Sequence, residues 1–216
     1  MSHISFIDCY SETPVITCFN DFITRTKCIS TYHMASQFGL KSLEVEPTPK
    51  AYVILGSASH VNQRLPWHKD LAIFIDQKLK LGIPVLGICF GHQLMADFYG
   101  CNVGYIDEKE TSYKEAREIY LTDECYGIKK DSKLTLAYCH SQIVIELSKD
   151  FKELAYSNLF NNEIIKHNTL PFIGTQAHPE ASMNFLNNET NASDELKKIA
   201  KSDGDKYLDH FILSLK

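Results

Sequence analysis

The apolar positions in the first half of the chain follow two alternating patterns. Residues 51–55 are apolar at every position, and residues 83–88 form a second apolar run. Continuous apolar runs of this length are typical of strands buried on both faces. Between them the apolar residues follow one helical stripe: Leu71, Phe74, Ile75 and Leu79. Pro66 is suited to open this helix and Gly82 to end it, so the pattern predicts strand, helix, strand.

Two further elements extend the alternation. Residues 4–8 form a short apolar run ending in Asp8 and predict a first strand. Residues 90–99 predict a helix that follows the second buried run directly and ends at Gly100. This order is typical of a parallel sheet with helices on both faces. The sequence therefore predicts the α/β class, with a single-domain, mostly parallel sheet flanked by helices.

The second half is richer in strands, and we expect it to add antiparallel strands to the sheet. The candidate strands are residues 118–122, 134–138, 142–147, 153–156, 164–167 and 172–176. Apolar residues at helical spacing between 196 and 215 predict a helix at the end of the chain. Gly204, within Ser-Asp-Gly-Asp, is expected to break this helix into two pieces.

The composition is typical of a globular protein and disfavours two functional classes, nucleic-acid binding and membrane insertion. Of the 216 residues 44% are hydrophobic and 23% charged, which excludes disordered and collagen-like classes. Lys and Arg total 22 against 27 Asp and Glu, a formal net charge of −5. Nucleic-acid-binding proteins usually carry a basic excess. The longest apolar stretch, residues 81–91, is shorter than the roughly 20 residues that span a bilayer. We therefore expect one domain over residues 1–216 that binds neither nucleic acid nor a membrane.

Cysteine usage and the amino-terminal segment bear on location. The chain has seven cysteines: Cys9, Cys18, Cys28, Cys89, Cys101, Cys125 and Cys139. An odd count, wide spacing and the lack of a Cys-x-x-Cys pair disfavour both a disulfide framework and a zinc knuckle. The first residues also lack the basic and apolar segments of a secretory signal. Together these features predict a cytoplasmic protein with free thiols.

The sequence Gly-Ile-Cys-Phe-Gly at residues 87–91 joins the second buried run to its helix. Two glycines around a small nucleophilic residue at such a junction match the nucleophile elbow, with Cys89 in the place of serine. The turn holds its apex residue in a strained conformation, and the helix amino terminus favours a thiolate. The amide of Phe90 would point to a developing oxyanion. Alone, the pattern also fits a buried cysteine in a glycine-rich turn, and it occurs in chaperone-like and protease-like proteins of this fold.

A second group of reactive residues lies in Thr-Gln-Ala-His-Pro-Glu at 175–180, after an apolar run. A thiol nucleophile needs a base, and the base needs an orienting group. His178 and Glu180 lie two apart across a proline, so both can project from one rigid turn into the same cleft. The alternative is a surface loop with a chance His-Pro-Glu. A zinc-deaminase interpretation fails because no Pro-Cys-x-x-Cys follows, and we expect no metal. His60 and His68 are expected at the surface.

Together these residues resemble the class I, triad-type, glutamine amidotransferases, and most closely the glutaminase domain of guanosine-monophosphate synthase. The resemblance rests on Gly-Ile-Cys-Phe-Gly-His-Gln at 87–93 and Gly-Thr-Gln-Ala-His-Pro-Glu at 174–180. Residues 53–57 (Val-Ile-Leu-Gly-Ser) and 140–144 (His-Ser-Gln-Ile-Val) match less closely. The first 50 residues carry little of it beyond a strand pattern. The resemblance implies a class I glutamine amidotransferase-like, flavodoxin-like fold with no cofactor.

The resemblance implies a Cys-His-Glu triad and a reaction. Cys89 would be the nucleophile, His178 the general acid and base, and Glu180 the residue that orients His178. The Cys89 thiolate would attack the side-chain amide carbon of glutamine, and His178 would protonate the leaving ammonia. Water activated by His178 would then hydrolyse the thioester and release glutamate. The implied enzyme is a glutamine amidohydrolase or amidotransferase.

The resemblance also implies substrate contacts. Gln93, one helical turn after Cys89, would contact the α-amino or α-carboxylate group of glutamine. Two backbone amides, at residue 56 or 57 and at residue 90, would form the oxyanion hole. Residues 140 and 141 fall where the family carries a His-Ser or His-x-Asp element that helps to hold glutamine. The implied substrate-binding residues are Gly56, Ser57, Phe90, Gln93, His140 and Ser141.

Gln142 departs from the family pattern. In the guanosine-monophosphate-synthase-like branch a carboxylate at this place faces the α-ammonium of glutamine. Hydrogen bonds to charged partners are worth roughly 1.5–3 kcal/mol, against about 1 for neutral ones. The departure predicts weak affinity for free glutamine unless a partner completes the site, or a preference for γ-glutamyl compounds with a modified amino group. Alternatively, Ser141 holds the substrate and Gln142 faces solvent.

Three functional hypotheses remain open. An amidotransferase domain delivers ammonia to a synthase, and no phosphate-binding Gly-x-x-x-x-Gly-Lys-[Ser/Thr] for one occurs here. The first hypothesis is a free-standing glutaminase that serves a separate ammonia-accepting synthase subunit. The second is a γ-glutamyl hydrolase or peptidase with the same triad. The third is a poorly active regulatory binding protein of the same fold.

Overall fold

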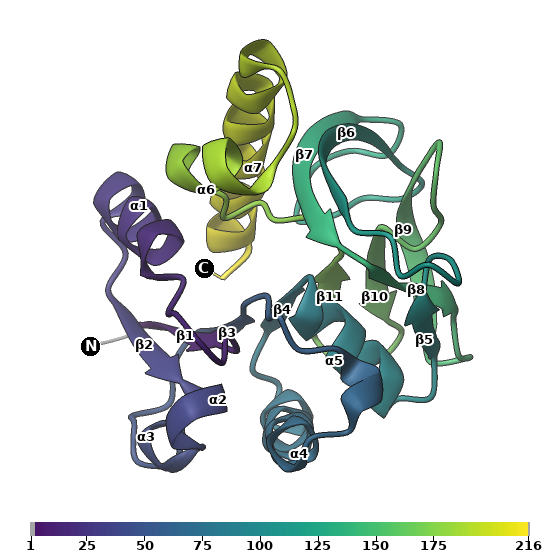
Figure 1. Cartoon of the computed structure of the whole chain (residues 1–216). Helices are drawn as coiled ribbons and strands as arrows, with labels where there is room; N and C mark the ends of the chain where they lie inside the picture. Colours follow the sequence, from purple (N-terminus) through teal and green to yellow (C-terminus); the bar gives the residue numbers. More distant parts are fainter. Residues whose placement is uncertain (1–2, 216) are drawn as a thin grey trace.

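The computed structural model describes residues 3–215 (Figure 1). Within these residues the main sheet has nine strands in the order β2-β1-β3-β4-β11-β10-β9-β6-β7. Its first part is parallel from β2 through β11. These strands are β2 (Ser30–Met34), β1 (Ile4–Asp8), β3 (Ala51–Ile54), β4 (Val85–Ile88) and β11 (Phe172–Thr175). Every residue of β1, β3, β4 and β11 is buried, as their apolar runs predict.

The second part of the sheet is antiparallel. It consists of β10 (Ile164–His167), β9 (Phe151–Ser157), β6 (Tyr113–Leu121) and β7 (Lys133–His140). Two further strands, β5 (Asn102–Tyr105) and β8 (Gln142–Glu146), form a separate antiparallel pair. The predicted α/β class, with a parallel sheet and antiparallel strands in the second half, is confirmed.

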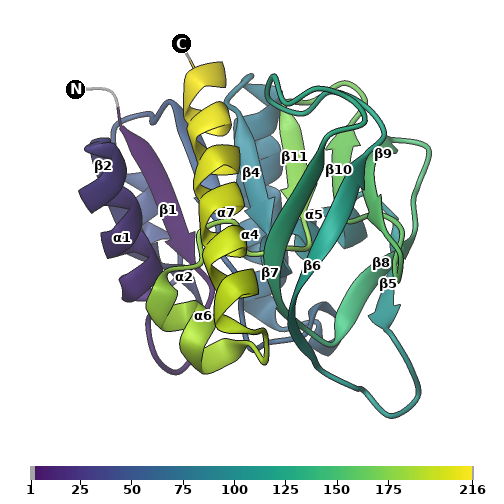
Figure 2. The same ribbon diagram turned by 90° about the horizontal axis from the view of Figure 1, so that it is seen from above.

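Helices cover both faces of the parallel strands (Figures 1 and 2). On one face α1 (Ile16–Thr26) and α7 (Asp194–Ser214) bury Phe19, Phe22, Leu208 and Phe211 against Phe6 and Val53. On the other, α4 (Pro66–Lys80) and α5 (Phe90–Phe98) bury Leu71, Phe74, Leu94 and Met95 against Ile7 and Ile54. Since alternate residues of β1 and β3 point to opposite faces, each strand contributes to both cores.

Short helices complete the part of the chain that the structure describes. They are α2 (Ala35–Phe38), α3 (Lys41–Glu44), the 3-10 helix η1 (Val61–Gln63) and α6 (Met183–Glu189). Among residues 3–215 no helix combines the length and apolar character needed to cross a bilayer.

Most predicted elements occur within a few residues of their expected bounds. Pro66 opens α4, and Gly82, at φ +80°, follows its end. The second buried strand begins at Val85 rather than at residue 83, and β6 begins at Tyr113, five residues before its predicted start. The prediction for His68 was wrong, because its ring is buried between Trp67 and Phe90 at centroid distances of 4.2 and 5.0 Å.

The predicted break at Gly204 was also wrong, because α7 runs without interruption from Asp194 to Ser214. The reason for glycine at this position is packing. A Cβ at Gly204 would lie 2.6 Å from the carbonyl oxygen of Pro179. The helix therefore approaches the backbone of the His-Pro-Glu turn more closely than any other residue would allow.

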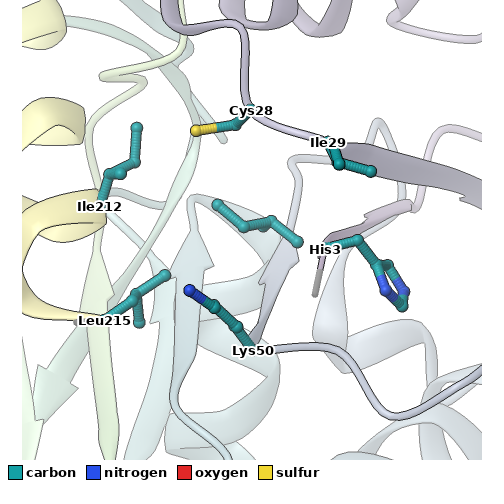
Figure 3. Close-up of a pocket in the computed structure, with 7 residues that line it drawn as sticks. His3, Cys28, Ile29, Lys50, Ile212 and Leu215 are labelled. Carbon is teal, nitrogen blue, oxygen red and sulfur yellow. The ribbon is translucent and has the colours of Figure 1, made fainter. Parts of the chain in front are cut away.

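The parallel strands define two ends of the sheet. Their carboxyl ends lead into the loops that contain Ser57, Cys89 and His178, so these loops meet at the carboxyl end of the sheet. At the opposite end of the strands lies a small, mostly apolar pocket of about 150 Å³ beside Cys28, Lys50 and Leu215 (Figure 3). The site residues predicted from the sequence do not line this small pocket.

Candidate active site

Cys89 lies at the junction of β4 and α5, in a backbone conformation that few side chains adopt. Its φ is 49° and its ψ −100°, and its amide donates to the carbonyl of Thr175 at 2.8 Å. The flanking glycines permit the tight turn, since a Cβ at Gly91 would lie 2.6 Å from the carbonyl oxygen of Ile54 and one at Gly87 would lie 2.8 Å from the Gly91 backbone. The strained apex that the sequence predicts is therefore present.

His178 and Glu180 form a buried pair in the turn after β11. Their side chains are joined by a 2.8 Å contact between His178 Nδ1 and Glu180 Oε1. Burial alone lowers the pKa of His178, but the charges of Glu180 and Cys89 outweigh burial and hold this pKa well above its ordinary value. The structure thus brings an imidazole, its carboxylate partner and a thiol within electrostatic reach of one another.

Gly56 lies between the thiol and the imidazole. A Cβ at this position would lie 2.9 Å from Cε1 and 3.7 Å from Nε2 of His178, and 3.7 Å from the Cβ of Cys89. Among residues 3–215 Nε2 of His178 has no hydrogen-bond partner. Because β3, β4 and β11 are neighbours in the sheet, their carboxyl ends bring residues 56, 89 and 178 to one point.

The backbone amides predicted for an oxyanion hole lie at the same place. The amide of Phe90 belongs to the first turn of α5, where helix amides have no acceptor within the helix. Ser57 Oγ donates to the carbonyl of Cys9 at 2.7 Å and accepts from the amide of Ser59 at 2.9 Å. These two bonds fix the loop that carries the amides of Gly56 and Ser57.

Gln93 is buried one turn after Cys89, and its amide nitrogen is bonded inside the protein. This Nε2 donates to the backbone carbonyl of Gln142 at 2.7 Å and to the side-chain oxygen of Gln176 at 3.0 Å. Both hydrogens are therefore used, so its side-chain oxygen is the group that remains for a substrate.

His140 ends β7 as a neutral, bonded ring. Arg117, which can only donate, lies 3.0 Å from its Nε2, so the Nδ1 hydrogen points to the carbonyl of Gln142 at 3.1 Å. Burial, reinforced by the charge of Arg117, lowers the pKa of His140 to about 3. His140 thus supports the backbone beside Ser141 and holds no charge at neutral pH.

Gln142 does not face solvent, so that part of the alternative was wrong, while the role of Ser141 in holding the substrate stays a prediction. The residue is 1% exposed, and among residues 3–215 neither its side-chain oxygen nor its side-chain nitrogen has a hydrogen-bond partner. It lines the cavity beside Cys89. An unpaired buried amide is costly, which favours a polar ligand as its partner.

One cavity of about 700 Å³ connects the predicted residues except Phe90, which does not line it. Cys89, Gln93, His140, Ser141, His178 and Glu180 all line it, together with Gly56 and Ser57. At its mouth Lys114 Nζ lies 3.3 Å from the carboxylate of Glu189. Within residues 3–215 no three His, Cys, Asp or Glu side chains are arranged to hold a metal.

Two residues of the site escaped the sequence analysis. Gln176 is buried with its amide nitrogen 3.7 Å from Cys89 Sγ, and Arg117 stacks on the ring of Tyr138 at 3.7 Å while it donates to His140. Gln176 belongs to the His-Pro-Glu segment and could have been found there. Arg117 lies in a strand without any motif, so only the fold reveals it.

The chain matches the family model described as glutamine amidotransferase class-I over residues 19–194. It is 38% identical over 127 residues to a glutamine-hydrolysing GMP synthase subunit of Pyrococcus abyssi, and the match covers 58% of this chain and 63% of that protein. It is 31% identical over 143 residues to "Gamma-glutamyl peptidase 4" of Arabidopsis thaliana, which covers 63% of this chain and 56% of that protein. The matched stretches therefore span less than two thirds of these relatives.

Solved structures agree with the fold. A putative GMP synthase subunit from Thermoplasma acidophilum superposes with a TM-score of 0.74 at 20% identity, covering 100% of this chain and 94% of that one. A glutamine amidotransferase from Thermotoga maritima gives a TM-score of 0.71 at 18% identity, covering 99% and 96%. At this identity the likeness concerns the fold alone.

Proposed function

This chain belongs to the class I glutamine amidotransferase family, and we propose that it hydrolyses the side-chain amide of glutamine with Cys89 as the covalent nucleophile. The observation that carries the proposal is that Cys89 and His178 meet at Gly56, with Glu180 in contact with the far nitrogen of the His178 ring. The pKa of His178, which the charges of Glu180 and Cys89 hold well above its ordinary value against the effect of burial, favours a protonated imidazole beside the sulfur.

The reaction follows from this arrangement. The Cys89 thiolate attacks the amide carbon, and the amides of Phe90 and of Gly56 or Ser57 donate to the developing oxyanion. The imidazolium of His178 gives its proton to the nitrogen, so the C–N bond breaks and ammonia leaves a γ-glutamyl thioester. His178, now neutral, takes a proton from water, and the hydroxide displaces the thiolate as glutamate forms.

We propose that the ammonia serves a separate synthase subunit. The similarity to proteins named as one subunit of a glutamine-hydrolysing GMP synthase supports this partner class. The sequence has no phosphate-binding loop with which to activate an acceptor itself. A cytoplasmic location remains a prediction from its cysteines.

Hydrolysis of γ-glutamyl peptides is the second candidate, and the size of the cavity favours it. A volume of about 700 Å³ falls within the range of sites that take drug-sized ligands and exceeds the needs of a single amino acid. The similarity to a protein named gamma-glutamyl peptidase 4 supports the same candidate.

Two assays test these proposals. Purified protein is incubated with glutamine and, separately, with γ-glutamyl dipeptides, and the glutamate released is measured against the Cys89→Ser variant. Glutamate from glutamine supports the first function, and glutamate from the dipeptides alone supports the second. If neither releases glutamate above the variant, a regulatory binding protein is the remaining function.

Covalent labelling tests the nucleophile itself. A diazo-ketone analogue of glutamine should label Cys89 alone, because burial raises the pKa of most other thiols and keeps them protonated. The thiols with raised pKa are Cys9, Cys18, Cys101, Cys125 and Cys139, with Cys18 at about 11 and Cys125 at about 12. Mass spectrometry that finds the label elsewhere, with Cys89 unmodified, would refute the assignment.

A further inference from the structure

A continuous chain of hydrogen bonds runs from a backbone carbonyl to the sulfur of Cys89 through two glutamine side chains. Gln93 Nε2 donates to the carbonyl of Gln142 at 2.7 Å and to Oε1 of Gln176 at 3.0 Å. Nε2 of Gln176 then lies 3.7 Å from Cys89 Sγ, within the range of an N–H···S bond. Gln93 and Gln176 are 4% and 2% exposed, so water does not compete for these contacts.

The backbone carbonyl fixes the direction of every bond in this chain. A carbonyl oxygen only accepts, so Gln93 must present its nitrogen to Gln142, and its second hydrogen must point to the oxygen of Gln176. Once that oxygen is taken, the nitrogen of Gln176 is the group that faces Cys89. The backbone of Gln176 is also held in place, because its N–H donates to the carbonyl of Glu163 at 2.8 Å.

The starting point of the chain is itself braced. The carbonyl of Gln142 also faces Nδ1 of His140 at 3.1 Å, and Arg117 holds the other nitrogen of that ring. Arg117 in turn donates to the buried carboxylate of Glu163 at 3.0 Å. Since Glu163 also supplies the carbonyl that anchors Gln176, both ends of the glutamine chain are tied to one residue.

We propose that Gln176 is a positioning residue for Cys89, and that its side-chain amide, oriented by Gln93, donates to the sulfur and stabilises the thiolate. The inference rests on the proposed role of Cys89 as nucleophile. A neutral donor to a charged sulfur gives a charge-assisted bond, which is stronger than a bond between neutral groups. It also limits the rotation of the sulfur, which favours one direction of attack.

Other groups that face Cys89 must be separated from this effect. His178, in the turn after β11, and Cys139, on β7, both interact electrostatically with the Cys89 sulfur. Glu180 acts behind His178. None of these residues bonds to the Gln176 side chain, so a change at Gln176 leaves them in place.

The test is the rate at which iodoacetamide alkylates Cys89 as a function of pH, followed by mass spectrometry of the peptide that contains it. The thiolate displaces iodide, so the rate reports the thiolate fraction without any substrate turnover. For Gln176→Met, which removes the donor without adding charge, we expect the midpoint of the profile to rise by about one pH unit. At pH values below both midpoints alkylation should then slow about ten-fold.

Three further variants complete the design. Gln176→Glu should raise the midpoint at least as far, since a carboxylate cannot donate and repels a thiolate. Gln93→Met should raise it without touching Gln176, since the amide then loses its fixed orientation. Ser5→Ala is the control, because Ser5 on β1 is another buried donor, bonded to the carboxylate of Glu46 at 2.7 Å and outside the Gln93–Gln176 network, so its replacement should leave the midpoint unchanged.

The outcomes separate this inference from the proposed function. An unchanged midpoint in Gln176→Met would overturn the positioning role, even if glutamine is hydrolysed. If Gln176→Met does not fold, an unchanged midpoint in Gln93→Met would overturn it equally. A shift in Gln176→Glu alone would assign the effect to charge and overturn the hydrogen bond. Raised midpoints in a protein that releases no glutamate would keep the inference and reject the glutaminase.

Discussion

At the residue scale, the buried pair of His178 and Glu180 has one member beside the thiol and one behind it. Nε2 of His178 lies next to Gly56 and Cys89, whereas Glu180 contacts the far nitrogen of the ring at 2.8 Å. We expect His178→Asn to remove nearly all amidase activity and Glu180→Gln to retain a part. In serine-protease triads, loss of the orienting carboxylate costs roughly 100-fold less than loss of the base. The comparison is made on kcat/KM.

Glu189→Gln provides the control, since this carboxylate lies at the mouth of the same cavity without contacting His178. Its replacement should change kcat little. Equal and complete loss in His178→Asn and Glu180→Gln, accompanied by a lower melting temperature of the latter, would assign Glu180 a structural role instead.

The unpaired amide of Gln142 carries a second prediction at this scale. Because it is buried, without a partner among residues 3–215, and lines the cavity, it is placed to meet a polar group of the substrate. A carboxylate there would add an ion pair to an α-ammonium, so Gln142→Asp should lower KM for glutamine with little change in kcat. An unchanged KM would show that Gln142 does not contact that group.

The sequence could predict the reactive residues but not the residues that hold them. Cys89, His178 and Glu180 lie in short motifs whose glycines and proline restrict the local backbone conformation. The structure brings all three to one cavity. Arg117 and Gln176 act through contacts across 23 and 87 positions of the chain. The Arg117 contact depends on the pairing of the antiparallel strands β6 and β7, and the Gln176 contact on the parallel pairing of β11 with β4. Gln176 lies in a recognisable motif, but neither contact follows from a local pattern.

At the element scale, burial decides which elements could be predicted. Strands β3 and β4 lie inside the sheet, and their apolar runs are buried at every position. The edge strand β2 is only half buried at most positions and has no such run. Helix α1 has a clear apolar face, at Cys18, Phe19 and Phe22. It was not predicted, because it lies in the first 50 residues, where no motif indicates which elements to expect.

Gly204 gives the prediction at this scale. In an exposed helix interior a Gly→Ala change stabilises by up to about 1 kcal/mol. Here a Cβ would lie 2.6 Å from the carbonyl oxygen of Pro179, which is backbone and cannot rotate away. Gly204→Ala should therefore lower the free energy of unfolding by roughly 1–3 kcal/mol, as overpacking does. It should also lower kcat, because Pro179 joins His178 to Glu180. Urea denaturation and steady-state kinetics measure the two effects.

Ser202→Ala is the matched control, since Ser202 is exposed on the same helix. It should leave kcat unchanged and raise stability slightly, because alanine is the better helix former. A Gly204→Ala protein as stable and as active as the control would show that α7 moves away from the turn without cost.

At the scale of the whole molecule, the site lies where the parallel and antiparallel parts of the sheet meet. The thiol comes from β4, the imidazole from the end of β11, and the supporting His140 from β7 at the far edge of the sheet. The fold also buries histidines that carry no carboxylate partner, on α4, α5 and β7. Burial lowers the pKa of His92 to about 3 and of His68 to about 4, as it does for His140.

These neutral histidines make the whole fold sensitive to acid. In the unfolded chain histidine is protonated below about pH 6.5, whereas in the folded state these rings stay neutral down to about pH 3–4. Between these values the unfolded state binds more protons, so stability decreases as the pH is lowered. His178 acts oppositely, since its raised pKa keeps its contribution in acid and loses it only at higher pH. At pH 5 each ring that stays neutral lowers the free energy of unfolding by about 2 kcal/mol.

The free energy of unfolding of His92→Leu, measured by urea denaturation, should therefore decrease by about 2 kcal/mol less between pH 7 and pH 5 than that of the wild type. Leu94→Ala, on the same helix, lowers stability without removing a titrating group and should keep the wild-type pH dependence. Parallel pH profiles for all three proteins would show that His92 is protonated in the fold.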